Sequence, residues 1–272
     1  MSAYPNRVLA KLHTLDFIKM PSNSLLTHWQ QGHTTLNGWL TIPSSWSAEV
    51  MAHAGFDSLT IDAQHGLATD LTTILPMLQA ISTTDTVPLV RVAWNDPAEH
   101  MRMLDAGAQG IICPMLDTRA ETEAFVKACR YPPLGYRSFG PLRAALRTGA
   151  EYYRTANAET ITLAMIETAA GYQNLEDIAQ TPHLTGLYVG TWDLSLSLGL
   201  EKTADFDDPI LLEILQHILD VAAKNKLVAG VHCDTPDNGI KMRKMGFQMV
   251  TPLTDTFLLQ KAAAEGIRKM QE

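Results

Sequence analysis

The sequence predicts an α/β fold, a single TIM (β/α)8 barrel of alternating strands and helices. From Gly38 onward, short apolar runs rich in β-branched residues alternate with longer helical segments, which is typical of βα units around a parallel sheet. Reactive side chains follow several of these runs, and parallel barrels carry their active sites at the C-terminal ends of their strands. The length of 272 residues suits one such barrel.

The expected strands are short apolar runs bounded by residues that favour turns. They lie at 38–42, 58–62, 87–92, 110–113, 160–166, 186–189, 227–231 and 248–251, which gives about eight βα units. The helices with the clearest signals are expected at 47–54, 71–81, from 96, from 118, from 235 and at 254–270.

Capping chemistry marks two of these helix starts. Asp96 is an expected N-cap followed by Pro97 at the first helical position, with Glu99 reaching back. Thr118 and Glu121 have the spacing of a capping box. Both signals place a helix soon after a strand, as a barrel of βα units requires.

The chain is expected to form one domain, because no linker divides it. Residues 36–272 are assigned to the barrel and residues 1–35 to an N-terminal extension outside the core. Residues 131–158 interrupt the alternation with Pro, Gly and Arg residues. A long segment of this kind is usually functional or an interface element.

The composition is that of an ordinary globular protein, with 46% hydrophobic and 18% charged residues. The net charge of −8, without a basic run, argues against binding to nucleic acid. No apolar run approaches the roughly 20 residues that span a bilayer, so no membrane association is expected. The three cysteines lack CxxC spacing, which predicts reduced thiols in a cytoplasmic protein.

Two carboxylates follow predicted strands and could bind a metal ion. Glu167 ends the run at 160–166, and Asp193 follows the run at 186–189. Carboxylate oxygens suit a hard divalent cation such as Mg²⁺ or Mn²⁺, which retains waters. Alternatively, Asp193 caps a short helix and Glu167 complements a helix dipole.

A histidine and an arginine lie at two further strand ends. His65 follows Asp62 by three residues, and an Asp that hydrogen-bonds one imidazole nitrogen leaves the other free as a base. Arg91 ends an apolar run, where its guanidinium could bind both oxygens of a substrate carboxylate. The alternatives are a surface-loop histidine and a salt bridge from Arg91 to Glu167 or Asp62.

Other chemistries receive less support from the sequence. No lysine lies at a predicted strand end, which disfavours a Schiff-base mechanism. No glycine-rich loop follows the last two strands, which disfavours a phosphorylated substrate. The adjacent residues His232, Cys233 and Asp234 cannot easily converge on one ion, so they are expected at most to line the pocket.

Five segments, in this order along residues 38 to about 255, resemble the HpcH/HpaI aldolases, a family of class II pyruvate-dependent aldolases. They are DAQHG at 62–66, Arg91 with WNDP at 94–97, RYPPLGYR at 130–137, IET at 166–168 and GTWDLS at 190–195. Each segment alone is a weak signal, but the ordered set is specific.

The resemblance implies a barrel of the phosphoenolpyruvate/pyruvate type, in a homo-oligomer (a trimer or hexamer) whose subunits exchange their C-terminal helices. It also implies an aldolase that reversibly cleaves 4-hydroxy-2-keto acids to pyruvate, or a related 2-keto acid, and an aldehyde. The implied cofactor is a divalent metal, Mg²⁺ or Mn²⁺, with Co²⁺ as a substitute in vitro.

The resemblance assigns the metal and the pyruvate carboxylate to two segments. Glu167 and Asp193 would be the metal ligands. Gly190, Trp192 and Asp193 would face the pyruvate carboxylate with their backbone amides. Trp192 is bulkier than the residue of many members, and Met165 replaces a Gln that many members have.

The remaining roles fall on the other two strand ends. His65, oriented by Asp62, would be the catalytic base, and Arg91 would hold pyruvate and its enolate. Many members have Glu where this chain has Gln64. A Gln at this position is similar to the sequences of a subgroup that resembles hydroxy-ketoacid aldolases. These departures leave the metal site and the base in place, and they leave the acceptor aldehyde open.

Two other functions stay open. A related pyruvate-enolate lyase, such as an oxaloacetate decarboxylase, would use the same metal and arginine without a general base. A CoA-ester lyase would also need a basic groove, for which the arginines of residues 137–154 are the candidates. A non-catalytic barrel that binds a keto acid would be suggested by loss of Glu167 or Asp193, but both are present.

Overall fold

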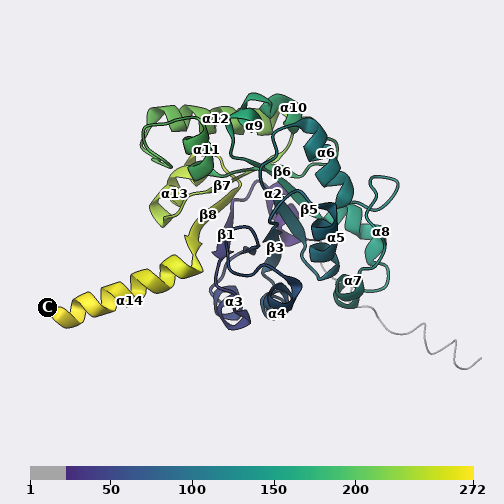
Figure 1. Cartoon of the computed structure of the whole chain (residues 1–272), viewed down its shortest axis with the longest axis horizontal. Coiled ribbons are helices and arrows are strands. Elements are labelled where there is room, and N and C mark those ends of the chain that lie inside the picture. The colour runs from purple at the N-terminus through teal and green to yellow at the C-terminus, as the bar shows by residue number, and fades with distance from the viewer. Residues whose placement is uncertain (1–22) are drawn as a thin grey trace, which may run out of the picture.

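A computed structural model describes residues 23–272 of the protein. Eight parallel strands close into a barrel in sequence order, and helices surround it (Figure 1). The predicted α/β barrel is therefore confirmed. The strands are β1 (Thr35–Leu40), β2 (Ser58–Asp62), β3 (Val87–Arg91), β4 (Gly110–Cys113), β5 (Ile161–Ile166), β6 (Gly186–Val189), β7 (Val228–His232) and β8 (Met249–Thr254).

The helices follow the strands along the chain, as expected for βα units. They are α2 (Ser24–Gln30), α3 (Ser45–Ala52), α4 (Leu71–Ile81), α5 (Pro97–Asp105), α6 (Arg119–Ala128), α7 (Leu142–Thr148), α8 (Tyr152–Glu159), α9 (Ala169–Gln173), α10 (Leu175–Ala179), α11 (Thr191–Ser197), α12 (Pro209–Lys224), α13 (Pro236–Met245) and α14 (Asp255–Gln271).

The two predicted caps are present. Asp96 accepts a hydrogen bond from the backbone N–H of Ala98 at 2.9 Å, and the Glu99 carboxylate reaches back to the N–H of Ala93 at 3.1 Å. Thr118 and Glu121 form the reciprocal capping box at the start of α6. The Asp96 bond and the capping box satisfy N–H groups that a helix start leaves unpaired, so they fix where α5 and α6 begin. The Glu99 bond goes instead to Ala93, three residues before the N-cap, and therefore holds the loop that leads into α5.

Neighbouring strand residues contribute to two separate groups of buried apolar side chains. Val90 and Ala164 pack with the surrounding helices, whereas the preceding residues Leu89 and Leu163 belong to the second group. This division follows from the alternation of side chains along a strand, which places successive residues on opposite faces of the sheet. The barrel is therefore packed on both faces.

Helix α2 packs into this second group. Leu25 and Trp29 are buried with Tyr188, and the Trp29 indole N–H donates to the Thr35 hydroxyl at 3.0 Å. Of the expected extension over residues 1–35, residues 24–30 thus contact the barrel, and β1 begins at Thr35 rather than at 38. The rest of that prediction, residues 1–22, lies outside the described residues.

The segment that interrupts the alternation holds α7 and α8, and its arginines make internal contacts. Arg137 is buried, pairs with Asp105 at 2.7 Å and lies between the rings of Tyr131 and Tyr152. Arg143 donates to two backbone carbonyls, in α4 and at the end of α5. These contacts attach the segment to the barrel and leave both guanidinium groups engaged.

Helix α14 projects away from the barrel (Figure 1). Its large apolar side chains are exposed, among them Phe257, Leu259, Ile267 and Met270. Across residues 23–272, no helix has the length and apolar character needed to cross a membrane. The three cysteines are free and buried, and the cytoplasmic location stays a prediction.

Candidate active site

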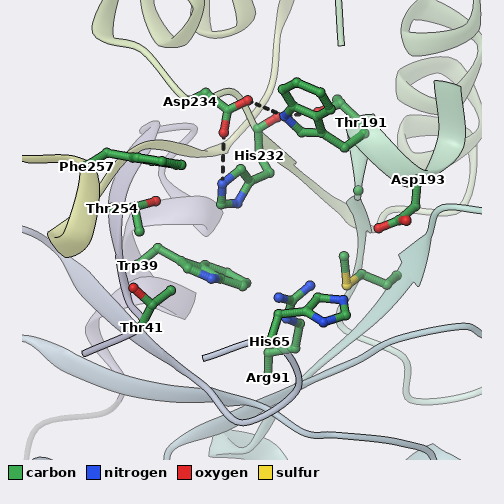
Figure 2. A pocket seen from close by; sticks show the side chains of 13 residues that line it. Trp39, Thr41, His65, Arg91, Thr191, Asp193, His232, Asp234, Thr254 and Phe257 are labelled. Atoms are coloured by element: carbon green, nitrogen blue, oxygen red, sulfur yellow. Dashed lines mark hydrogen bonds and ion pairs between the residues drawn. The ribbon is translucent and has the colours of Figure 1, made fainter. Parts of the chain in front are cut away.

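A pocket of about 270 Å³ opens where the C-terminal ends of the barrel strands meet (Figure 2). Five of the residues predicted for the site line it: His65, Arg91, Gly190, Trp192 and Asp193. The remaining lining residues are Trp39, Thr41, Met165, Thr191, His232, Asp234, Thr254 and Phe257. The strand-end pattern in the sequence therefore identifies residues that share one cavity.

Arg91 is held in this pocket by Asp62. The two residues are register partners on β3 and β2, and their side chains form a two-point ion pair: Nε to Oδ1 at 2.9 Å and Nη2 to Oδ2 at 2.6 Å. Burial alone would raise the pKa of Asp62, but the hydrogen bonds and charge of Arg91 bring the pKa below its usual value. Asp62 is therefore a carboxylate that fixes the guanidinium.

The structure corrects the predicted contact between Asp62 and the His65 ring. Asp62 accepts from the backbone N–H groups of Gln64 and His65, at 3.1 and 3.2 Å, and from the Trp39 indole. With Arg91 also bound, both carboxylate oxygens are occupied. The His65 imidazole has no hydrogen-bond partner within residues 23–272 and is exposed in the pocket on the same side as Arg91 (Figure 2).

Glu167 lies beside the pocket and is nearly fully buried, with 2% of its surface exposed. Its Oε1 accepts the backbone N–H of Met115 at 2.7 Å. Burial raises the pKa of Glu167 to about 7, and the nearby charges of Asp193 and Asp117 act in the same direction, against the Met115 hydrogen bond. A buried carboxylate with like charges nearby is suited to a bound cation.

Glycine at position 190 makes room for this carboxylate. A Cβ there would lie 2.7 Å from Glu167 Oε2 and 2.8 Å from Met165 Cε. Asp193 lies in the first turn of α11, where the N-cap is Gly190 and no side chain caps the helix. The alternative role of Asp193 as an N-cap is therefore not observed, and its carboxylate is exposed in the pocket.

The sequence profile of the HpcH/HpaI aldolase/citrate lyase family matches residues 38–262. The chain belongs to this family. The match confirms the predicted family and covers all eight strand ends, including those that carry Arg91 and Glu167.

Relatives in this family are similar over most of the chain. A hydroxypyruvate/pyruvate aldolase of Rhizorhabdus wittichii is 36% identical over 245 residues, 90% of this chain and 97% of that protein. A 4-hydroxy-2-oxo-heptane-1,7-dioate aldolase of Escherichia coli is 33% identical over 244 residues, 89% of this chain and 92% of that protein. The chain is accordingly an aldolase, a carbon–carbon lyase.

A solved structure agrees with the fold. The HpcH/HpaI aldolase/citrate lyase family protein from Burkholderia cenocepacia superposes with a TM-score of 0.85 at 28% identity. The superposition covers 92% of this chain and 100% of that one. The whole of the Burkholderia cenocepacia chain therefore shares the barrel fold described above.

The three positions that the sequence predicts to differ from many HpcH/HpaI members lie in or next to the site. Met165 lines the pocket, and the Trp192 indole N–H donates to Asp234 at 2.5 Å. The buried Oε1 of Gln64 accepts no hydrogen bond from the part of the chain that the structure describes. All three differences concern polar contacts around the pocket rather than the carboxylates of Glu167 and Asp193.

Trp39 is a site residue that the sequence did not single out. Its indole N–H donates to Asp62 at 3.2 Å, and its ring lies 4.9 Å from the Arg91 guanidinium carbon. Trp39 belongs to a predicted strand, but an aromatic residue in a strand is ordinarily core. Thr254, the last residue of β8, and Phe257 also line the pocket. The sequence does not predict this, because it ends the strand at 251, three residues before the observed end.

Proposed function

We propose that this protein is a divalent-metal-dependent aldolase that reversibly cleaves 4-hydroxy-2-keto acids to pyruvate, or a related 2-keto acid, and an aldehyde. One observation carries the proposal: Arg91 lies in the pocket with a free end. Its Nε and Nη2 bind Asp62, whereas Nη1 has no hydrogen-bond partner among residues 23–272 and is not sealed from solvent. A fixed cation with free N–H groups suits a carboxylate or an enolate oxygen.

The carboxylates of Glu167 and Asp193 would hold the metal, Mg²⁺ or Mn²⁺. Both donors are oxygens, Glu167 Oε2 has no hydrogen-bond partner in the described chain, and two protein ligands leave positions for water and substrate. When bound, the cation supplies Lewis-acid polarisation of the keto oxygen.

The reaction then depends on two side chains from the same side of the pocket. His65, whose ring is unpartnered and accessible, takes the proton from the C4 hydroxyl of the keto acid. The C3–C4 bond breaks, the aldehyde leaves, and the bonding electrons form the enolate. The Arg91 guanidinium stabilises the developing oxyanion, and a proton returned to C3 gives pyruvate.

The substrate carboxylate would lie against residues 190–193. The backbone N–H groups of Trp192 and Asp193 lie in the first turn of α11, where N–H groups have no partner within the helix. The predicted contact from the Gly190 amide is wrong, because the Gly190 N–H donates to the Ile166 carbonyl at 3.2 Å. Gly190 and Asp193 are both in the pocket wall, next to Glu167. In this proposal the keto and carboxylate oxygens of a 2-keto acid would lie beside Glu167 and Asp193.

We also propose a homo-oligomer, a trimer or a hexamer, in which α14 is exchanged between subunits. The exposed apolar side chains of a helix that projects from its own barrel support this proposal (Figure 1). The arginines available for a CoA groove, by contrast, are engaged: Arg137 with Asp105, and Arg154 with Glu151. A CoA-ester substrate is therefore less well supported.

The test is pyruvate release from 4-hydroxy-2-keto acids by metal-stripped protein, before and after addition of Mn²⁺ or Mg²⁺. Cleavage that the metal restores is the expected result. Deuterium exchange into pyruvate without cleavage would instead favour a decarboxylase such as one acting on oxaloacetate. A protein that neither binds metal nor exchanges the pyruvate protons would be a keto-acid-binding barrel, and the proposal would be wrong.

A further inference from the structure

We propose that Asp234 selects the aldehyde: it favours acceptors that carry hydroxyl groups and rejects acceptors that carry a carboxylate. The inference rests on the proposed aldolase function and concerns the part of the pocket that the mechanism above does not use. Asp234 is thus a specificity-determining residue of the same site.

Asp234 lies across the pocket from the residues proposed to do the chemistry. Figure 2 shows Asp234 and His232 on one side of the cavity, and His65 and Arg91 on the opposite side. An aldehyde that reacts beside His65 therefore extends its far end toward the side of Asp234. In a pocket of about 270 Å³ that also holds the keto acid, a short acceptor reaches this wall.

Two donors fix the Asp234 carboxylate. The Trp192 indole N–H donates to Oδ2 at 2.5 Å, and His232 Nε2 lies 3.3 Å from Oδ1. Burial raises the pKa of Asp234, but these two contacts outweigh it and hold the pKa below its usual value. Each carboxylate oxygen can accept more than one hydrogen bond, so the group keeps capacity for a substrate hydroxyl.

His232 is itself anchored in the barrel. Its Nδ1 lies 3.3 Å from the Tyr188 hydroxyl, which donates to Thr251 at 2.8 Å, and its ring meets the Trp39 ring edge-on at 4.9 Å. Tyr188 is fully buried. The wall that carries Asp234 is therefore rigid, as a selective contact requires.

The backbone at Asp234 determines which substitutions can test its side chain. Its φ is +53°, in the left-handed region that glycine adopts most readily and that costs other residues free energy. Asp and Asn tolerate this conformation better than other side chains, so a neutral Asn can replace Asp234 with little strain.

The charges of the pocket explain the rejection of carboxylates. Among the described residues that line the pocket there is no lysine, and the one arginine is Arg91. Arg91 lies on the side opposite Asp234, and its charge is paired with Asp62. A carboxylate at the far end of an aldehyde would meet Asp234 in a partly buried site that has no lysine or arginine on this side. Like charges in such a site repel, whereas a hydroxyl donor gains a charge-assisted hydrogen bond.

The experiment compares three aldehydes in aldol addition to pyruvate: glyceraldehyde, propionaldehyde and succinate semialdehyde. Each kcat/KM is divided by the rate at which the same protein exchanges pyruvate protons with deuterium, so that changes in enolate chemistry cancel. In the wild type, glyceraldehyde should exceed the other two by about tenfold or more. In Asp234→Asn, the ratio of the glyceraldehyde rate to the propionaldehyde rate should fall by about tenfold, and the relative rate with succinate semialdehyde should rise.

Asp237→Asn is the matched control, because Asp237 is exposed in the first turn of α13 and does not line the pocket. It should leave the three ratios unchanged. If Asp234→Asn does not fold, Asp234→Gly serves, since glycine suits the positive φ and removes the carboxylate entirely.

The outcomes separate the two proposals. Pyruvate exchange with aldehyde ratios that do not respond to either Asp234 variant would overturn the inference alone. A wild type that prefers succinate semialdehyde would also overturn it. A wild type that neither exchanges pyruvate protons nor cleaves keto acids would overturn the proposed function, and the inference with it.

Discussion

Arg91 and Asp62 are the last residues of two adjacent strands, and their side chains meet in a two-point ion pair at 2.9 and 2.6 Å. Both side chains are almost fully buried, at 9% and 2% exposure. The pair uses the Nε and Nη2 atoms of the guanidinium. The remaining nitrogen, Nη1, has no hydrogen-bond partner in the described chain. Asp62 is therefore a positioning residue for the group proposed to bind the enolate.

Asp62→Asn is expected to cost both stability and activity. Breaking a buried pair leaves an uncompensated charge on Arg91, so the free energy of unfolding should fall by about 3 kcal/mol. Activity should fall because the guanidinium loses its fixed orientation. Urea unfolding and pyruvate release measure the two effects. Asp207→Asn, which breaks the exposed pair with Lys241, should change neither, and equal effects of the two variants would contradict the prediction.

Glu167 should make the metal-free protein less stable as pH rises. The pKa of Glu167 is about 7 in the folded protein, whereas the ordinary value, which applies to the unfolded chain, is 4.5. Between these two pH values the native state keeps a proton that the unfolded chain has released. The free energy of unfolding therefore decreases with rising pH across this window, by about 3 kcal/mol in total. This contribution is complete below the lower value and absent above the higher one.

The variant Glu167→Gln isolates this effect, because Gln stays neutral and can still accept the Met115 N–H. In EDTA, its advantage in unfolding free energy over the wild type should grow from near zero at about pH 4.5 to about 3 kcal/mol at about pH 8. Glu176→Gln, at an exposed position, is the control. A constant difference between Glu167→Gln and wild type at all pH values would show that burial does not shift this carboxyl.

Gly190→Ala should weaken metal binding without unfolding the protein. The new Cβ would lie 2.7 Å from Glu167 Oε2 and 2.9 Å from Glu167 Cβ, so the carboxylate must move. Displacing a metal ligand in this way should lower Mn²⁺ affinity by about tenfold or more, measured by calorimetric titration. Gly140→Ala is the matched control, because its Cβ would meet only Asp105 at an ordinary 3.7 Å. Unchanged affinity in Gly190→Ala would argue against Glu167 as a ligand.

The parts of the fold that the sequence predicts correctly depend on local signals. The strand at 58–62 and the capping box at Thr118 lie where expected, because alternation and capping are set by neighbouring residues. Helix α2 escaped prediction because its seven residues are too few to show a period. Strand β8 continues through Pro252, a residue that ordinarily argues against a strand.

The site divides in the same way. Strand ends identify His65, Arg91 and Asp193, because the barrel brings all such ends to one face. The partner of Asp62 depends instead on the register of β2 against β3, because this register places Arg91 opposite Asp62. Spacing of three residues favoured His65, but side-chain geometry decides such pairs, and no pattern in the sequence encodes it.

The exposed apolar residues of α14 should hold subunits together. Replacing Leu259 and Ile267, which are 65% and 59% exposed, with Glu should dissociate the oligomer, because two charges would enter a buried apolar contact. Sedimentation velocity measures the mass of the assembly. Lys261→Glu, on the same helix, is the control for added negative charge. A wild-type protein that sediments as a monomer would contradict the proposed exchange of α14.

His65→Ala should remove the general base and leave the rest of the pocket in place. The ring makes no hydrogen bond within residues 23–272, so its loss disturbs no described contact, whereas general-base catalysis contributes about a hundredfold to ten-thousandfold in rate. Cleavage of a 4-hydroxy-2-keto acid should fall by this factor, with Mn²⁺ affinity unchanged. His33→Ala, at an exposed site outside the pocket, should retain full activity. Because decarboxylation of oxaloacetate needs no base, its rate should survive in His65→Ala; equal loss of both activities would assign His65 to substrate binding instead.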